Sequence, residues 1–249
     1  MKFAILIPTY NESTSIPELI DSLAQLRQTG EFDFDILVID DNSPDGTAEI
    51  VQAMGHEWVR LLKRPGKDGL GNAYRAGFVD ILAQPQYDQI VTMDADGSHR
   101  VADLPLMFRA AQPGLSIVLG TRWIKGGSVV NWPKSRQLLS RSGTRYASLA
   151  LGINLADLTG GFRIYSRELL NALNLHQMSA TGYCFQIEMA LASHLAGARA
   201  TQVPITFVER INGVSKMSRA IVIEALIQTT RWGFTRRLRP NADKLHYVK

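Results

Sequence analysis

Short apolar runs of strand length alternate in this chain with longer segments whose apolar residues recur at helical spacing. Residues 3–7 (FAILI) and 36–40 (ILVID) have the length and β-branched composition of buried strands, and a helical pattern separates them. Ser15 and Glu18 fit a capping box at the start of that helix, and Gly30 fits its C-terminal stop. This strand–helix–strand unit predicts parallel strands joined by a right-handed crossover.

The same alternation continues along the chain of 249 residues and predicts one α/β domain. It favours an open sheet that is parallel in its first half and mixed in its second half. Further strands are expected at 58–63, 89–93, 115–121, 160–166 and 200–208. Further helices are expected at 71–84, 101–112, 133–151, 183–198 and from about 218 onward.

Bulk properties exclude several classes of protein. The single Cys184 rules out an intrachain disulfide and argues against a cysteine metal site. The first apolar run stops at Pro8, which is not the pattern of a signal peptide, and we expect no membrane-spanning segment. The net charge of +4 is mild, but basic residues cluster at 122–145 and 231–244. Such clusters favour phosphates, lipid headgroups or nucleic acid as partners, with a solvated basic face as the simpler alternative.

Polar and special residues gather where the predicted strands end. Ligands of open α/β sheets bind at the carboxyl ends of the strands, so a site is expected at that edge. The segments at those ends are PTYNE, DDNSPDG, RPGKDGLG, DADGSH and GTRW.

Two of these carboxylates, Asp94 and Asp96, directly follow a buried strand. Side chains at i and i+2 of an extended chain face the same side, and two anions 4 Å apart repel by about 4 kcal/mol at intermediate dielectric. A hard cation such as Mg²⁺ or Mn²⁺ removes that penalty, and phosphate oxygens and water usually complete its ligands. The alternative is a solvated turn before a helix, because Asp-x-Asp also occurs by chance.

Asp40, at the end of another strand, suits a hydrogen bond to a base or a ribose hydroxyl, whereas Asp45 fits a Pro-Asp-Gly turn.

Taken in order, several motifs resemble those of the dolichol-phosphate (polyprenol-phosphate) mannosyltransferases, in their short type without carboxy-terminal membrane spans. The motifs are PTYNE, VIDDNSPDGT, GLGNAYRAGF, MDADGSH, GTR, LTGGFRIYSR, GYCFQIEM and ERINGVSK, within residues 3–217. The resemblance implies glycosyltransferase family 2 and the glycosyltransferase-A fold, a Rossmann-like three-layer α/β sandwich with a mostly parallel, partly mixed sheet. It implies transfer of mannose, with inversion, from GDP-mannose to a polyprenyl monophosphate. Residues 1–217 would form the catalytic domain, and residues 218–249 an amphipathic helix and basic tail.

The resemblance also assigns roles to residues. Asp94 and Asp96 would hold Mg²⁺ or Mn²⁺, and Arg122, Arg136 and Ser140 would receive the acceptor phosphate. Asp96, Arg122 and Arg136 are the predicted catalytic residues. Ser98 stands where many relatives carry Gln, so Asp96 and water are expected to supply more of the metal's ligands. The predicted donor-binding residues are Pro8, Tyr10, Glu12, Asp40, Asp94, Ala95, Asp96, Arg210 and Lys216.

The expected chemistry needs no general base. A phosphate monoester has a second pKa of about 6 and is largely dianionic at neutral pH, so it is already a nucleophile. Catalysis then depends on positioning and on neutralising the charge of the leaving diphosphate. We expect His99 to act at a helix start or behind the metal ligands, and we expect Arg163 to pair with a carboxylate. Gln186 and Glu188 either order the site or simply pack.

A lipid acceptor must come from a membrane, and the last helix offers both apolar and basic residues. We expect it to lie at the surface of the cytoplasmic face as a peripheral contact, with core packing of the aliphatic residues as the alternative. The residues concerned are Ile221, Val222, Ala225, Leu226, Trp232, Arg236, Arg237 and Arg239.

Two other functions are consistent with the sequence. The first is a family 2 transferase that uses another nucleotide sugar, such as UDP-glucose, or a saccharide acceptor, which would need a catalytic base. The second is a non-catalytic module that binds a nucleotide sugar or a nucleic acid. We do not expect nucleic acid as a partner, because a nucleic-acid binder would not place aspartates at so many strand ends.

Overall fold

The computed structural model describes residues 1–182, 184–209, 219–238, 244 and 246–249, and for residues 219–221 it describes the backbone alone. Its centre is a seven-stranded sheet with the strand order β3-β2-β1-β4-β7-β5-β8. The strands are β1 (Lys2–Thr9), β2 (Asp33–Asp40), β3 (Val59–Lys63), β4 (Gln89–Thr92), β5 (Ser116–Thr121), β7 (Arg163–Ser166) and β8 (Arg199–Pro204). A small second sheet pairs β6 (Ser128–Val130) with β9 (Thr206–Val208) in parallel.

The direction of β7 makes the main sheet mixed. β7 is antiparallel to both of its neighbours, β4 and β5, whereas the other neighbouring strands of the sheet are parallel. The prediction of a sheet that is parallel first and mixed later is therefore confirmed.

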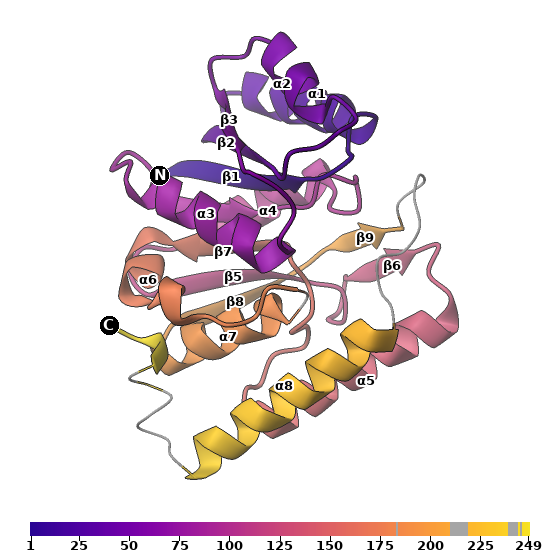
Figure 1. Ribbon diagram of the computed structural model, residues 1–249, viewed down its shortest axis with the longest axis vertical. Coiled ribbons are helices and arrows are strands. Elements are labelled where there is room, and N and C mark those ends of the chain that lie inside the picture. Colours follow the sequence, from indigo (N-terminus) through magenta and orange to yellow (C-terminus); the bar gives the residue numbers. More distant parts are fainter. Residues whose placement is uncertain (183, 210–218, 239–243, 245) are drawn as a thin grey trace.

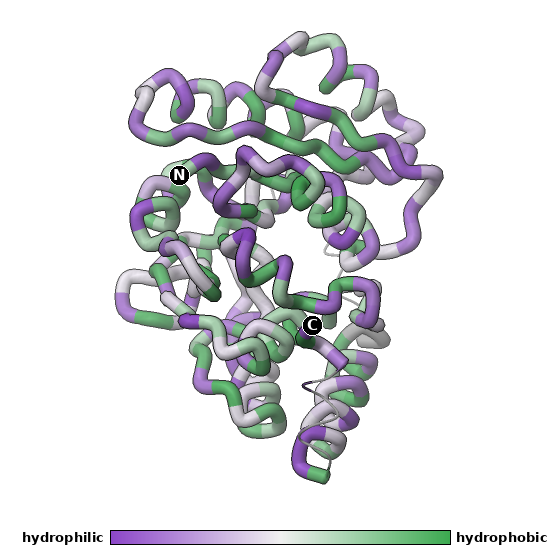
Figure 2. The backbone as a smooth tube through the Cα atoms, turned by 90° about the vertical axis from the view of Figure 1, so that its left-hand side faces the viewer, coloured by the Kyte–Doolittle hydropathy of each residue, from purple (hydrophilic) through white to green (hydrophobic). Residues whose placement is uncertain are grey.

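Helices cover both faces of the sheet and give three layers (Figure 1). Side chains alternate along β1: Ala4 and Leu6 pack into the core cluster that contains α3, α6 and α7, whereas Phe3, Ile5 and Ile7 pack into the cluster that contains α1, α2 and α4. Hydrophobic residues accordingly follow the central strands in Figure 2. The helices are α1 (Ser15–Gln28), α2 (Thr47–Ala53), α3 (Leu70–Leu82), α4 (Leu104–Ala110), α5 (Lys134–Leu151), α6 (Arg167–Ala172), α7 (Phe185–Leu195) and α8 (Arg219–Leu238).

The helices α5 and α8 lie side by side below the sheet (Figure 1). Beyond α8 the chain returns to the main body, where Val248 bridges to Leu173 and the Tyr247 hydroxyl donates to Glu188 Oε1 at 3.1 Å. The C-terminal residues are thus anchored on the predicted catalytic domain, and the predicted boundary at 217/218 lies outside the described residues. No helix in the described part of the chain has the length and apolar character needed to cross a bilayer.

The first helix starts differently from the expectation. α1 begins at Ser15 itself, preceded by Thr14, and no side chain caps it. The Ser15 hydroxyl donates instead to Glu12 Oε2 at 2.8 Å, so the predicted capping box with Glu18 is wrong. The helix stop was predicted correctly, because Gly30 adopts the left-handed conformation with φ 69°.

Candidate active site

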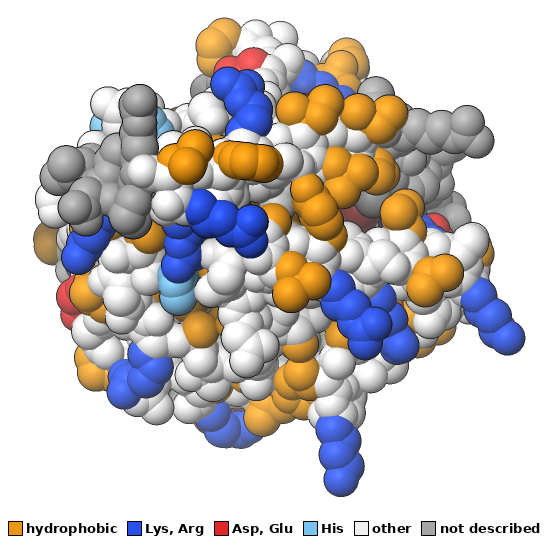
Figure 3. Space-filling view, turned by 90° about the horizontal axis from the view of Figure 1, so that it is seen from below, with side chains coloured by type: hydrophobic (Ala, Val, Ile, Leu, Met, Phe, Trp, Pro, Cys, Tyr) orange, Lys and Arg blue, Asp and Glu red, His pale blue; other side chains and the backbone are white. Residues whose placement is uncertain are grey.

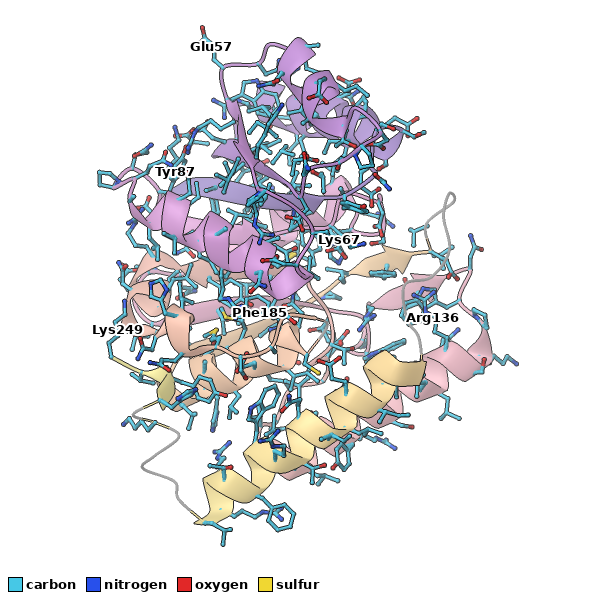
Figure 4. The ribbon with its side chains drawn as sticks, viewed as in Figure 1. Glu57, Lys67, Tyr87, Arg136, Phe185 and Lys249 are labelled. Atoms are coloured by element: carbon cyan, nitrogen blue, oxygen red, sulfur yellow. The ribbon has the colours of Figure 1, made fainter. Side chains whose placement is uncertain are left out.

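The predicted site residues gather along one edge of the sheet. Parallel pairing brings together the carboxyl ends of β1, β2 and β4, since Thr9 is aligned with Asp40 and Leu6 with Thr92. β7 begins at this same edge because it runs in the opposite direction, with Arg163 opposite Thr92. Figure 4 places Lys67 and Arg136 on this side of the molecule and Tyr87 and Lys249 on the other.

The loop that contains Asp94 and Asp96 is held by its own backbone and by a buried histidine. The Asp94 amide donates to His99 Nδ1 at 3.0 Å, and the Ser98 amide donates to Asp96 Oδ1 at 3.0 Å. The His99 ring is buried and stacks on Phe162 with centroids 4.7 Å apart. Both carboxylates are half-buried at the end of β4, while the His99 imidazole supports the loop from beneath.

Beneath the same carboxylates lies a tyrosine, Tyr74 of α3, that the sequence did not single out. Its side chain is fully buried, and its hydroxyl lies next to the Asp94 carboxylate. Burial, followed by the negative charge of Asp94, raises the pKa of Tyr74 well above its ordinary value, and Asp96 adds to the shift. The hydroxyl therefore stays protonated and is a neutral polar group next to the carboxylates. The signal was present in the GLGNAYRAGF motif, but a buried tyrosine there also fits simple packing.

The donor set of the loop fits a divalent metal bound together with a ligand. Asp94 and Asp96 offer hard carboxylate oxygens, and the described residues contain no group of three or more His, Cys, Asp or Glu arranged to hold a metal. Two carboxylates alone leave most positions to phosphate oxygens and water, as is usual for Mg²⁺. The Ser98 hydroxyl is buried and has no hydrogen-bond partner among the described residues, and the expectation that it contributes little to a metal site stays a prediction.

The predicted nucleoside corner lies at the ends of β1 and β2. Asp40 is buried and accepts hydrogen bonds from Thr9 Oγ1 at 3.0 Å and from the Ser43 amide and hydroxyl at 2.9 and 2.6 Å. Its carboxylate therefore fixes the loop that follows β2. The half-buried Pro8, near the end of β1, leads to Tyr10, whose ring lies under Lys67 Nζ at 4.2 Å.

Glu12 and Asp45 hold the loops beside that corner. The Glu12 amide donates to Thr47 Oγ1 at 3.0 Å, and Asp45 accepts from the Ser13 amide at 3.0 Å and from the Thr47 hydroxyl at 2.5 Å. Burial opposes ionisation of Asp45, but these hydrogen bonds outweigh it and lower the pKa of Asp45 to about 2. Asp45 is thus a turn residue, as its sequence context predicted.

Arg122, at the end of β5, is held by a buried carboxylate. Its Nε and Nη2 donate to the two oxygens of Asp157 at 2.6 and 2.8 Å, and Nη2 also reaches Thr159 Oγ1 at 2.8 Å. Burial by itself raises the pKa of Asp157, but the charge and hydrogen bonds of Arg122 outweigh burial, so the pKa of Asp157 lies below its ordinary value. The guanidinium is therefore fixed in place on the LTGGF turn.

Arg136 and Ser140, one turn apart on α5, come close to Arg122. Ser140 Oγ is 3.5 Å from Arg122 Nη2, and the guanidiniums of Arg122 and Arg136 both lie over the ring of Trp132, at 5.2 and 4.0 Å. Arg136 also forms an ion pair with Glu209. The three residues predicted to receive the acceptor phosphate are thus neighbours in space, although Arg122 follows β5 and the other two lie on α5.

Comparison with known proteins decides the family. Residues 4–173 match the model of "Glycosyl transferase family 2". The chain belongs to glycosyltransferase family 2. An undecaprenyl-phosphate mannosyltransferase from Micrococcus luteus is 44% identical and covers 95% of this chain and 96% of its own. A polyprenol monophosphomannose synthase from Mycolicibacterium smegmatis is 38% identical and covers 94% of this chain and 88% of its own. The resemblance found in the motifs is confirmed, and the protein is a glycosyltransferase.

Solved structures confirm the glycosyltransferase-A fold. Glucosyl-3-phosphoglycerate synthase from Mycobacterium tuberculosis, in complex with Mn²⁺, UDP and phosphoglyceric acid, aligns with a TM-score of 0.66 at 20% identity. The alignment covers 96% of this transferase and 78% of that chain. The same enzyme in complex with Mg²⁺ and UDP aligns with a TM-score of 0.62 at 21% identity, over 95% of this transferase and 79% of that chain.

Other polar residues of the transferase motifs take positions that the sequence did not settle. Arg163 is fully buried and donates to the carbonyls of Gly160, Gln186 and Leu158, so the expected pairing with a carboxylate is wrong; Asp157 pairs with Arg122 instead. Glu188 accepts from the amides of residues 179 and 180, which orders the segment before α7. The side-chain amide of Gln186 is buried and has no hydrogen-bond partner in the described part of the chain.

The residues of the last helix that were expected at a membrane surface divide between its two sides: Leu226 and Arg237 are exposed, whereas Trp232 is not. Trp232 is 9% exposed and packs in the core, and Arg236 turns inward to donate to the Leu151 carbonyl, so neither presents itself to a membrane. The exposed apolar side chains of α8 are Ile223, Leu226, Ile227, Phe234 and Leu238. The predictions for Arg210, Lys216 and Arg239, and for the Ile221 side chain, lie outside the described residues.

Proposed function

We propose that this transferase moves mannose, with inversion, from GDP-mannose to a polyprenyl monophosphate, and that it depends on Mg²⁺ or Mn²⁺. The observation that carries the proposal is the proximity of two unlike binding groups at one sheet edge. The ring of Phe207 contacts both, with its centroid 5.6 Å from that of His99 and 5.4 Å from the guanidinium carbon of Arg122. One is the Asp94–Asp96 loop, suited to a metal diphosphate, and the other is the cluster of Arg122, Arg136 and Ser140, suited to a phosphate monoester. The names of the two bacterial relatives support the same acceptor and the same sugar.

The reaction is a single displacement at the anomeric carbon of mannose. An oxygen of the acceptor phosphate forms a bond to that carbon as the bond to the diphosphate oxygen breaks on the opposite face, which inverts the configuration. The acceptor dianion has no proton to lose, so no general base is required. His99 fits this scheme, since its Nδ1 already accepts from the Asp94 amide and serves the loop.

The protein's contribution is to bring two anions together in line. Arg122, fixed by Asp157, and Arg136 offset the charge of the acceptor phosphate and hold it near the sugar. When bound, Mg²⁺ or Mn²⁺ neutralises the charge that develops on the leaving diphosphate, with Asp94 and Asp96 as its protein ligands. Pro8, Tyr10, Glu12 and Asp40, with the Ala95 backbone, border the proposed nucleoside and diphosphate site. Arg210 and Lys216 are proposed to clamp the diphosphate.

A membrane contact belongs to this proposal because the acceptor is a lipid. Large apolar side chains are exposed on α5 as well as on α8, and basic residues such as Arg231 and Arg237 are exposed among them. Figure 3 shows hydrophobic and basic side chains interspersed on the face that α5 and α8 form. On α5 the exposed residues are Leu138, Leu139, Tyr146 and Leu149. We infer that this α5–α8 face lies on the cytoplasmic surface of a membrane, with basic residues next to anionic headgroups.

A donor screen tests the proposal. The purified protein is incubated with a detergent-dispersed polyprenyl phosphate, Mn²⁺ and one labelled nucleotide sugar at a time, and the lipid product is tested for cleavage by mild acid. We expect transfer from GDP-mannose, abolition by EDTA, and a loss of at least about a hundredfold in Asp96→Ala. Asp21→Ala, which removes an exposed carboxylate from α1, is the matched control and should retain activity. Consumption of UDP-glucose in place of GDP-mannose would refute the donor assignment.

A further inference from the structure

Two tryptophans connect three arginines beside the proposed acceptor site. The ring of Trp123 lies under the guanidiniums of Arg141 and Arg122, with distances of 4.7 and 5.3 Å from the carbon to the ring centroid. The ring of Trp132 lies under Arg122 and Arg136, at 5.2 and 4.0 Å. These five residues, which we call the arginine–tryptophan cluster, come from the segments around β5, the approach to α5 and α5 itself.

The cluster holds more positive than negative charge. Asp157 pairs with Arg122 and Glu209 pairs with Arg136. Arg141 forms no ion pair with any carboxylate among the described residues, and it is exposed on α5. The negative faces of the indole rings attract the three guanidiniums, but they do not neutralise them. One positive charge therefore remains available to an anion.

Three buried N–H groups of the cluster have no hydrogen-bond partner among the residues that the structure describes: Trp123 Nε1, Trp132 Nε1 and Arg136 Nε. An unpaired buried donor is costly, and most such groups in folded proteins are satisfied. All three groups donate, and none accepts. A ligand that satisfies them must therefore present acceptor oxygens, as a phosphate does.

We propose that Arg141, Trp123 and Trp132 bind the phosphate monoester of the lipid acceptor together with Arg122 and Arg136. This assignment rests on the proposed function and adds three residues to its acceptor site. The α5 helix carries Arg136, Ser140 and Arg141 together with the exposed Leu138 and Leu149, so it presents cations and lipid-facing side chains on one element. Arg141 is the exposed, uncompensated cation that a phosphate arriving from the bilayer meets first, whereas Arg122 and Arg136 already have carboxylate partners.

The first test compares Arg141→Gln with Arg145→Gln. Arg145 is one turn further along α5, is also exposed, and lies over no aromatic ring among the described contacts, so it is a matched control for charge. With farnesyl phosphate as the acceptor in detergent, we expect Arg141→Gln to raise the acceptor KM about tenfold, the usual effect of losing a hydrogen bond to a charged group. The donor KM should not change in either variant, and Arg145→Gln should behave like the wild type.

The second test removes only the indole N–H groups. Trp123→Phe and Trp132→Phe keep an aromatic face for the arginines but lose the donor. We expect each to weaken farnesyl phosphate binding about threefold or more, because a charge-assisted hydrogen bond is lost. Binding is followed by the fluorescence of the remaining tryptophans, with farnesol as the ligand that lacks the phosphate. Farnesol should bind equally weakly to the wild type and to both variants.

The outcomes separate this assignment from the proposed function. If Arg141→Gln weakens the binding of farnesyl phosphate but the wild type transfers no mannose, the cluster binds the phosphate monoester and the proposed reaction is refuted. If the wild type transfers mannose but Arg141→Gln and Arg145→Gln have equal acceptor KM values, the assignment of the cluster to the acceptor phosphate is refuted. A third arm uses phosphatidylglycerol vesicles: if Arg141→Gln weakens only vesicle binding, the cluster recognises headgroup phosphodiesters, and the assignment to the acceptor is wrong.

Discussion

At the scale of single residues, the ion pair between Arg122 and Asp157 is the best-defined contact of the acceptor side. Asp157 is 1% exposed and Arg122 is 6% exposed, so neither charge can be solvated if its partner is removed. We predict that Asp157→Asn destabilises the protein by about 3 kcal/mol and raises the acceptor KM, because Arg122 is left as an uncompensated buried cation that is no longer held in place. Urea unfolding and acceptor kinetics measure the two effects.

The difference in stability between the wild type and Asp157→Asn should depend on pH, because the pKa of Asp157 is lowered in the folded protein. A carboxylate whose folded pKa lies below its unfolded value of 3.8 stabilises the fold fully above that value. The contribution is lost as the pH falls through the folded pKa. The stability gap between the wild type and Asp157→Asn should therefore be constant near neutral pH and shrink below about pH 4. A gap that narrows between pH 8 and 6 would contradict this explanation.

Cys184 offers a second prediction at the residue scale. Burial, with smaller contributions from Glu224 and Glu188, raises the pKa of its thiol to about 11. The thiolate is the reactive form, so the native protein should not react with a thiol reagent at pH 8, whereas the unfolded protein should react with one equivalent. Absorbance after addition of Ellman's reagent, with and without guanidinium, measures this. Rapid modification of the native protein would contradict the buried position of the side chain.

The sequence located the carboxylates of this site more reliably than it located their partners. Asp94 and Asp96 could be placed because they end an apolar run, and parallel strands bring such ends to one edge. The position of Asp157 in the sequence did not indicate which arginine forms its ion pair. Arg122 and Arg163 were both available near that edge, and the reversed direction of β7, together with the carbonyls around Arg163, determines which arginine reaches the carboxylate.

At the scale of elements, the close packing of α5 against α8 depends on a glycine. A Cβ added to Gly233 of α8 would lie 2.6 Å from the carbonyl oxygen of Ala150 in α5, and that backbone atom cannot move without the helix. We predict that Gly233→Ala destabilises the protein by about 1–3 kcal/mol because the two helices must separate. Gly143→Ala is the control within α5: a Cβ there meets nothing within 4 Å and should stabilise the helix by about 0.5–1 kcal/mol. Thermal unfolding of both variants checks the opposite signs.

Some helices and strands of the protein could be predicted from the sequence, and others could not. The long apolar strands and α1, α3, α5 and α7 were expected because each has enough residues to display its periodicity. The short helices α2 (Thr47–Ala53) and α6 and the strand β6 were not expected, and the single strand expected at 200–208 is divided into β8 and β9. α2 follows a Pro-Asp-Gly turn that dominates the local signal, and strands of three residues cannot show alternation. The exposed side of α8 was predicted only in part, with Leu226 exposed but Trp232 packed, because apolar residues occur on both its packed and its exposed sides.

At the scale of the whole molecule, the position of α5 relates the proposed membrane contact to the proposed acceptor site. The first turns of α5 carry Arg136 and Ser140, which adjoin Arg122 at the sheet edge, while Leu138 and Leu149 are exposed on the α5–α8 face. A protein that rests on a bilayer through this face brings its acceptor arginines close to the headgroup level. In this proposed arrangement the phosphate of a lipid acceptor would travel only a short distance, and the sheet with its proposed nucleotide site would remain in water.

This arrangement predicts how the protein binds vesicles. Leu149 is 79% exposed and Phe234 is 62% exposed on the α5–α8 face, whereas Val79, 49% exposed, lies on α3 away from it. We expect Leu149→Ser and Phe234→Ser each to weaken binding to phosphatidylglycerol vesicles about tenfold, because each removes an apolar side chain from the bilayer. Val79→Ser should bind like the wild type, and added salt should weaken binding of all four proteins by screening the arginines. Activity on farnesyl phosphate in detergent should stay unchanged in every variant. Equal vesicle binding by Leu149→Ser, Phe234→Ser and Val79→Ser would show that another face meets the membrane.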